Sequence, residues 1–236
     1  MVLIGGVLGA QLFARRPIFP RLLTGVMFAG VGICLYLTYS RAALAGLTVG
    51  LLLLGVVRYR KLLAVLLIAG ALMLLLPHTQ DYVARFIEGV RGEDRATQMR
   101  LGEYKDAFIL ISRYPWFGVG FAGTPDIDTY LGVSSAYLLL AEQMGLVGLA
   151  VFLGIMLGFL IYTWGGWRRL PRDADLEPLL LGLVAGLVGA LAAGVLDHYF
   201  FNFDFPHSVS LFWLYIGLGA AAATLARQTA GAPAAT

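Results

Sequence analysis

Long apolar stretches separated by short polar breaks dominate the pattern of this chain. Most stretches have close to the ~20 residues that an α-helix needs to cross a bilayer, and none alternates like a membrane β-strand of ~10 residues. The pattern therefore predicts an all-α fold, a polytopic bundle of transmembrane helices with six full spans and a partial N-terminal one. The seven stretches are Met1–Phe13, Leu22–Leu37, Ala42–Val57, Leu62–Leu76, Tyr137–Tyr162, Leu179–Leu196 and Ser208–Ala226.

The ends of the chain and one long insertion complete this organisation. Met1–Phe13 is too short to span upright and lacks the small-residue cleavage site of a signal peptide. We therefore expect residues 1–236 to be a single membrane domain that is the C-terminal part of a longer protein. Residues 77–136 form one large loop, and the small-residue tail Thr229–Thr236 is expected to be disordered.

Basic residues occupy every second break between the apolar stretches. By the positive-inside rule these breaks face the cytoplasm, so the loop 77–136 and the other breaks face outward. A polar site is thereby predicted on the extracytoplasmic face. The basic residues are Arg15, Arg16, Arg21, Arg58, Arg60, Lys61, Arg168, Arg169, Arg172 and Arg227, and the polar groups at outer membrane ends are Arg41, Glu142, Asp197, His198, Asp204 and His207.

Composition narrows the class of protein further. A content of 59% hydrophobic and 13% charged residues, with a mean hydropathy of +0.81, excludes an ordinary soluble globule. The net charge of +3 comes from the inner loops, so we expect no nucleic-acid partner. The single cysteine, Cys34, excludes a disulfide within the chain and is predicted to be a buried apolar residue.

A tight helical hairpin is predicted where Thr38–Arg41 joins the second and third stretches. Ser40 suits the N-cap of the following helix, and Arg41 then lies in its first turn at the outer membrane surface. A guanidinium group there suits bidentate binding of a phosphate, but it also suits simple anchoring at the interface. Both interpretations of Arg41 stay open from the residues alone.

Within the outer loop, Arg95–Arg113 has the period of an amphipathic helix. Such a helix can lie on the outer leaflet or against the bundle. Pro115 ends it, and Gly118 and Gly120 permit a turn or a close approach to a ligand. The apolar face carries Leu101, Tyr104, Phe108 and Ile111, and the polar face carries Arg100, Glu103, Lys105 and Asp106.

Two residues are candidates for a catalytic base. His198, within Asp197–Asn202, lies where a helix leaves the membrane, a position that equally fits a capped helix end with an aromatic belt. Glu142 either pairs with Arg41 or Arg100, or acts as a base when buried. His78 and His207 are interpreted as surface residues. No phosphate-binding glycine loop, HExxH or GxSxG motif is present, so we expect a lipid-borne donor, no metal and no other cofactor.

Three short motifs together carry a family resemblance. Thr38-Tyr39-Ser40-Arg41-Ala42 opens a helix, Arg100 precedes Tyr104, Ala107 and the run Pro115–Gly120, and Tyr137-Leu138 precedes Glu142–Leu149. In order and spacing these motifs resemble those of the O-antigen ligase/polymerase superfamily of bacterial envelope proteins, over roughly residues 20–226.

The resemblance implies a multi-pass protein of the bacterial inner membrane whose active face is extracytoplasmic. Members transfer a glycan from a polyprenyl-diphosphate carrier to a lipid or protein acceptor. The resemblance implies that Arg41 and Arg100 hold the diphosphate, and that an acceptor hydroxyl attacks the anomeric carbon with inversion. We expect His198 and Glu142 as catalytic candidates, with Ser40, Gly118, Gly120, Tyr137 and Asp197 supporting them.

One departure from the family pattern concerns the base. Ligases usually carry a histidine just before the Tyr-Leu of the third motif, whereas Ser134 and Ser135 stand there in this chain. Serine does not replace imidazole as a base at neutral pH. A transporter or flippase-like protein, or a non-catalytic membrane subunit of envelope polysaccharide assembly, is therefore kept as the alternative.

Overall fold

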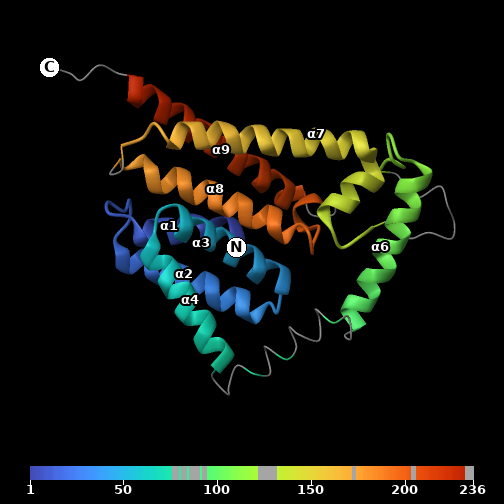
Figure 1. Cartoon of the computed structure of the whole chain (residues 1–236), viewed down its shortest axis with the longest axis horizontal. Coiled ribbons are helices and arrows are strands. Elements are labelled where there is room, and N and C mark those ends of the chain that lie inside the picture. The colour runs from blue at the N-terminus through green and yellow to red at the C-terminus, as the bar shows by residue number, and fades with distance from the viewer. Residues whose placement is uncertain are drawn as a thin grey trace. The chain divides into compact units, whose positions relative to one another are not determined.

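The computed structural model describes residues 1–75, 80, 84, 91, 95–121, 132–171, 174–202 and 206–231. Every regular element among these residues is a helix, which confirms the all-α part of the predicted fold class. His78, Asp126, Asp128, Arg172 and Asp204 lie outside the described residues. The helices labelled in Figure 1 are α1 (Val2–Phe13), α2 (Arg21–Leu37), α3 (Arg41–Val57), α4 (Arg60–Leu75), α6 (Arg95–Arg113), α7 (Ala136–Trp167), α8 (Leu176–Ala193) and α9 (Pro206–Gly231), and a 3₁₀ turn, η2, covers Tyr199–Phe201.

Two compact units divide the chain, and each is described by itself. The first holds α1, α2, α3, the start of α4, the C-terminal part of α7, α8 and α9. The second holds α6, the N-terminal part of α7 and η2. The predicted single membrane domain stays a prediction. The first unit comprises Met1–Ala64, Ile155–Ala193 and Pro206–Thr236, and the second comprises Val65–Gly154 and Gly194–Phe205.

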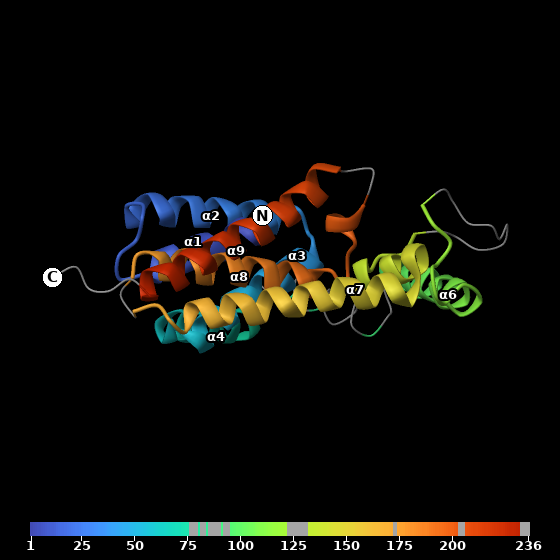
Figure 2. The same cartoon turned by 90° about the horizontal axis from the view of Figure 1, so that it is seen from above.

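Helix α8 is the centre of the first unit and packs against α1, α3 and α9 (Figures 1 and 2). Its glycines allow the helix backbones to touch. A Cβ atom on Gly182 would come within 2.7 Å of the Val7 Cα in α1, and one on Gly186 would come within 2.5 Å of the Leu3 carbonyl oxygen. Small residues at such crossings are typical of helix packing in membranes, where apolar side chains gain little by leaving lipid.

Helix α9 packs on α8 through alanines and runs further than the sequence indicated. Thr229 donates a hydrogen bond through Oγ1 to the Leu225 carbonyl at 3.0 Å, and the helix continues to Gly231. The prediction of disorder from Thr229 onward is therefore wrong for 229–231, because an alanine-rich sequence readily extends a helix. The buried contacts between the two helices involve Leu180, Leu183, Ala222, Ala223 and Ala226.

Three helices among the described residues, α7, α8 and α9, are long and apolar enough to cross a membrane. Helices α1, α2 and α3 are apolar but shorter, so the count of six full spans stays a prediction. Large apolar side chains cover the outside of α2, where Leu22 is 82% exposed, and a surface of this kind suits lipid.

Cys34 is exposed on α2, so the prediction of its burial is wrong. The physical reason is the peripheral position of this helix, in which only Thr24 and Leu35 are buried.

Candidate functional site

The corner between α2 and α3 belongs to the first unit and holds the first sequence motif. Ser40 caps α3 as predicted, because its Oγ accepts a hydrogen bond from the Ala43 N–H at 3.2 Å. Thr38 Oγ1 donates to the Leu35 carbonyl at 2.8 Å and so fixes the end of α2. Arg41 is the first residue of α3 and is partly exposed. The start of a helix favours anions.

Helix α6 of the second unit has the predicted bounds. Ala107 and Leu110 are fully buried, whereas Leu101 and Phe108 are 56% and 61% exposed. The apolar face predicted from Leu101 and Phe108 is therefore not packed in this unit. The small Ala107 allows a close approach, and polar groups beside it make hydrogen bonds across the contact.

Glu103 makes the main polar contact between α6 and the start of α7. Its Oε2 accepts hydrogen bonds from the N–H of Ser134 at 3.0 Å and from the Oγ of Ser134 at 2.7 Å. Ser134 is one of the two residues that stand where ligases usually carry histidine. The Ser134 hydroxyl group therefore has a structural role, because its hydrogen bond to Glu103 holds α6 against the start of α7.

Tyr104 lies beside this contact, and Arg100 precedes it by one helical turn. The Tyr104 hydroxyl is oriented toward the carbonyl oxygens of Ser134 and Val195, at 3.4 and 3.5 Å. Burial raises the pKa of Tyr104, the Arg100 guanidinium opposes this rise and the Glu103 carboxylate adds to it. The phenol is therefore neutral at physiological pH. Arg100 lies one turn before Glu103 and Tyr104, whose hydrogen bonds fix this part of α6.

The most distinctive backbone feature of the second unit is a break in α7. Gly145 has φ 70° and ψ −177°, a conformation that only glycine adopts without strain. The break frees backbone groups of the helix on both sides, and in an apolar setting such groups need partners.

The run Pro115–Gly120 supplies those partners. The N–H groups of Val119 and Gly120 donate to the carbonyl oxygens of Glu142 and Gln143 at 2.8 and 2.9 Å. In the opposite direction, the N–H groups of Leu146 and Val147 donate to the carbonyl oxygens of Pro115 and Trp116 at 2.7 and 3.4 Å. The second and third sequence motifs are therefore two halves of one structural element.

Glycine is required at two points of this contact because the two backbones approach closely. A Cβ atom on Gly118, which has φ 67°, would come within 2.6 Å of the Gln143 carbonyl carbon. A Cβ atom on Gly145 would come within 2.5 Å of the Phe117 nitrogen. Gly120, with φ 82°, meets no such obstacle and is needed for its backbone conformation alone.

Glu142 lies directly at this break with its side chain 1% exposed. No side chain among the described residues hydrogen-bonds its carboxyl oxygens, and the backbone N–H of Gly132 interacts with them. Within this unit the expected pairing with Arg100 is thus not made through a hydrogen bond, and the pairing with Arg41, which belongs to the first unit, stays a prediction. Burying a carboxyl group without a side-chain partner costs about 1–3 kcal/mol, and native proteins rarely tolerate such a cost without a functional reason.

The segment that follows α8 carries His198. Asp197 Oδ1 accepts a hydrogen bond from the Tyr199 N–H at 3.1 Å, which fixes the turn into η2. His198 Nε2 lies 3.4 Å from the Asn202 side-chain nitrogen, and His198 Nδ1 is buried without a hydrogen-bond partner among the described residues. His198 is therefore a second candidate base with an unused ring nitrogen.

Aromatic rings connect this segment to α7 inside the second unit. The rings of Phe201 and Phe152 meet edge to face at 5.1 Å between centroids, and Phe152 lies 6.3 Å from the ring of Tyr137. The Ala136 N–H also donates to the Gly194 carbonyl at 2.8 Å. Tyr137, predicted as a supporting residue, thus belongs to the contact that positions the His198 segment.

The second unit contains most of the residues predicted from the sequence. These are Arg100, Gly118, Gly120, Ser134, Tyr137, Glu142, Asp197 and His198, while Ser40 and Arg41 lie in the first unit. The structural role of Glu103 was not predicted, although its position one turn from Arg100 was a usable signal. The break at Gly145 was not predicted either, because a glycine inside an apolar run is common in continuous membrane helices.

Such a fold defines a helical membrane protein with buried, unpaired polar groups near the ends of its helices. Residues 25–153, more than half of the chain, match the family model described as O-antigen ligase, and the chain belongs to this family. The match contains all three sequence motifs and ends before Asp197. No curated protein matches the sequence. Membership implies a membrane enzyme of the glycosyltransferase kind that acts on a polysaccharide-linked lipid.

Proposed function

We propose that this protein transfers a glycan from a polyprenyl-diphosphate carrier to a lipid or protein acceptor at the outer face of the bacterial cytoplasmic membrane. The acceptor hydroxyl forms a new bond to the anomeric carbon while the bond from that carbon to the diphosphate breaks. Attack from the face opposite the diphosphate inverts the configuration. The products are the glycosylated acceptor and free polyprenyl diphosphate.

The observation that supports this proposal most directly is the state of Glu142. Its carboxyl group is buried near the break in α7 and has no side-chain partner among the described residues. A general base must accept the proton of the attacking hydroxyl, and a carboxyl group without a competing partner is suited to that step. His198 is the second candidate, since its Nδ1 is also buried and unpaired in the described chain.

The two arginines are proposed to hold the diphosphate. Guanidinium groups bind phosphate oxygens in a bidentate manner and stabilise the negative charge that develops on the leaving group. Arg100 is carried by a helix that Glu103 and Tyr104 attach to the start of α7. Arg41 begins α3, where the helix itself favours an anion.

We propose that the transfer is independent of a metal ion, with the arginines supplying the positive charge. Asp126 and Asp128 form an Asp-x-Asp pair in the sequence and lie outside the described residues. Activity retained in excess EDTA would support this part of the proposal. Activity lost in EDTA and restored by Mg²⁺ or Mn²⁺ would overturn it.

The test is reconstitution of the purified protein in liposomes with a polyprenyl-diphosphate-linked glycan and candidate acceptors. Release of polyprenyl diphosphate is measured for the unmodified protein, Arg41→Ala and Arg100→Ala. Arg113→Ala, in the last turn of the same helix α6, is the matched control. We expect Arg41→Ala and Arg100→Ala each to slow release by about 10²–10³-fold, the usual effect of removing one donor to a developing charge. We expect Arg113→Ala to stay close to the unmodified rate.

The same assay identifies the base. Glu142→Gln keeps the shape of the side chain and removes its basicity, so we expect a large fall in turnover with little change in donor binding. His198→Gln is compared with it under the same conditions. Release unaffected by Arg100→Ala would show that Arg100 has no part in holding the donor. No release with any acceptor from folded protein would favour the transporter or the non-catalytic subunit.

A further inference from the structure

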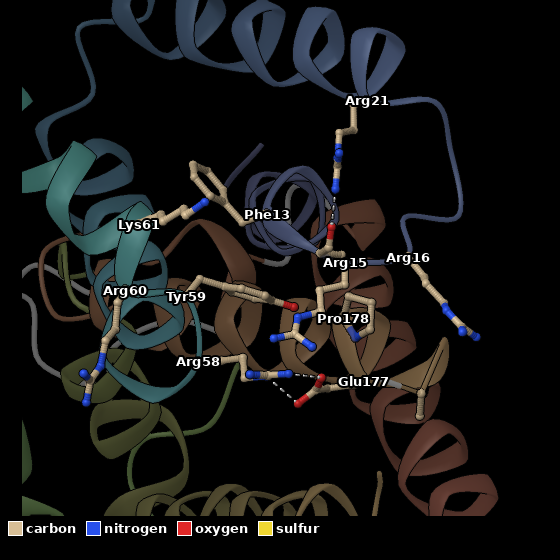
Figure 3. A pocket seen from close by; sticks show the side chains of 12 residues that line it. Phe13, Arg15, Arg16, Arg21, Arg58, Tyr59, Arg60, Lys61, Glu177 and Pro178 are labelled. Atoms are coloured by element: carbon tan, nitrogen blue, oxygen red, sulfur yellow. Dashed lines mark hydrogen bonds and ion pairs between the residues drawn. The ribbon is translucent and has the colours of Figure 1, made fainter. Parts of the chain in front are cut away.

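A basic pocket lies in the first unit, apart from every residue assigned above (Figure 3). Its volume is about 430 Å³, and it opens between the end of α1, the turn between α3 and α4, and the start of α8. Aromatic surface from Phe13 and Tyr59 forms part of its wall. The cationic residues that line it are Arg15, Arg16, Arg21, Arg58, Arg60 and Lys61.

One of these cations, Arg58, pairs with the carboxylate of Glu177. Arg58 donates from Nε and Nη2 to the two carboxylate oxygens of Glu177, at 2.8 and 3.2 Å. Trp167 Nε1 donates to the same carboxylate at 3.2 Å. Glu177 is the only carboxylate lining the pocket among the residues that the structure describes, so the pocket carries a large positive excess.

The wall of the pocket is built by defined contacts. Arg21 Nη2 donates to the Ala14 carbonyl at 3.1 Å, and Gln11 Oε1 accepts from the Ile18 N–H at 2.9 Å. These bonds fold the connection between α1 and α2 over the end of α1. In Figure 3 the guanidinium groups of Arg15 and Arg58 turn toward the middle of the pocket, and Arg16 extends away from it.

Apolar side chains continue from the charged wall toward the helices. Ile18 and Phe19 are 54% and 52% exposed in the same connection, and Leu22 at the start of α2 is 82% exposed. Cations that meet an exposed apolar surface at the end of membrane helices match the two parts of a phospholipid, a charged headgroup and its acyl chains. A free phosphate ion would use the cations alone.

We propose that this pocket binds the phosphate headgroup of an anionic phospholipid, with the acyl chains along Ile18, Phe19 and Leu22. Arginine binds phosphate oxygens through paired N–H donors, and basic pockets between membrane helices on the cytoplasmic side bind acidic headgroups. The predicted topology places this end of the bundle in the cytoplasm, which agrees with such a ligand. The bound lipid would neutralise the cationic groups and join α1, α2 and α4 at one end of the unit.

The test measures lipid binding directly and needs no glycan transfer. The purified chain in a neutral detergent is titrated with cardiolipin or phosphatidylglycerol. Phosphatidylcholine and inorganic phosphate at equal phosphate concentration serve as the comparison probes. Native mass spectrometry counts retained lipids, and the thermal midpoint reports stabilisation. The pocket variant combines Arg15→Gln and Lys61→Gln, both exposed side chains, and leaves the Arg58–Glu177 pair intact.

A matched control separates the pocket from general surface charge. It combines Arg168→Gln and Arg169→Gln, which are also exposed and predicted to face the cytoplasm but do not line the pocket. We expect the anionic lipids to be retained and stabilising in the unmodified chain and in this control. In the pocket variant we expect the affinity to fall about fivefold per removed charge, on the order of 25-fold in total.

Three results would overturn the proposal. Equal losses in both variants would show that the lipid recognises overall charge. Unchanged binding in the pocket variant would show that the lipid lies elsewhere. Stabilisation by inorganic phosphate equal to that by the lipids would identify a free anion as the ligand. A variant that binds lipid weakly because it is misfolded is recognised by its thermal midpoint without lipid, and Arg15→Gln alone then replaces it.

Discussion

The contact between the Pro115–Gly120 turn and the break in α7 gives a sharp prediction for Gly145→Ala. Gly145 has φ 70° and ψ −177°, and an alanine Cβ there would collide with the backbone of Trp116 and Phe117. The collision is with backbone atoms, which have no flexible end to move aside. We expect the turn to be displaced from α7.

The structure sets the size of this effect. Backbone strain at a glycine-only conformation amounts to about 1–3 kcal/mol. Four hydrogen bonds cross the contact, and each contributes about 0.5–1.5 kcal/mol. Strain with loss of half of these bonds gives about 3 kcal/mol or more. For a chain of this size that corresponds to a fall of roughly 6–12 °C in the thermal midpoint.

The assay compares Gly145→Ala with Gly154→Ala by thermal unfolding in detergent and by hydrogen exchange. Gly154 lies in the same helix, and a Cβ atom there meets nothing within 4 Å, so its replacement should leave the midpoint unchanged or raise it. We expect the amides of Val119 and Gly120 to lose protection only in Gly145→Ala. Equal midpoints for both variants, with both amides still protected, would refute the reasoning.

Three further predictions concern other contacts. Gly186→Ala should separate α8 from α1 and lower the free energy of unfolding by about 1–3 kcal/mol. Gly30→Ala is the control, because a Cβ atom there has no neighbour within 4 Å, and chemical denaturation should show no loss of stability. Glu103→Ala removes two hydrogen bonds to Ser134 and should cost about 1–3 kcal/mol, read from the same denaturation curves. Burial, helped by Glu177 and opposed by Arg58, raises the pKa of Tyr59 to about 12. The folded chain therefore holds this proton more tightly, so stability should fall as pH rises from about 10 to 12, and Tyr59→Phe should remove that part of the fall.

The sequence by itself determined the helical class and the ends of several elements. Apolar length and turn residues act locally, so α6 was predicted with its observed bounds and Ser40 with its capping hydrogen bond. The family followed from three short motifs in the right order. These features depend on residues close together in the chain, which a sequence displays directly.

The tertiary structure decided which side of each element is used and which groups meet. Periodicity marked Leu101 and Phe108 as part of one apolar face of α6 and left open whether that face lies on the outer leaflet or against the bundle. In the structure this face is exposed, and Ala107 and Leu110 make the buried contact. Cys34 is exposed for a related reason, since nothing in its own helix shows that the helix lies at the periphery.

The site shows the same division most clearly. The sequence contained Pro115–Gly120 and Glu142–Leu149 as separate motifs, and no local signal indicated that one completes the hydrogen bonds of the other. Their pairing depends on backbone groups freed at Gly145, and those groups are chemically identical in every residue. Side-chain chemistry can be read along a chain, whereas the partner of a main-chain N–H or carbonyl group is fixed only when the fold brings two segments together.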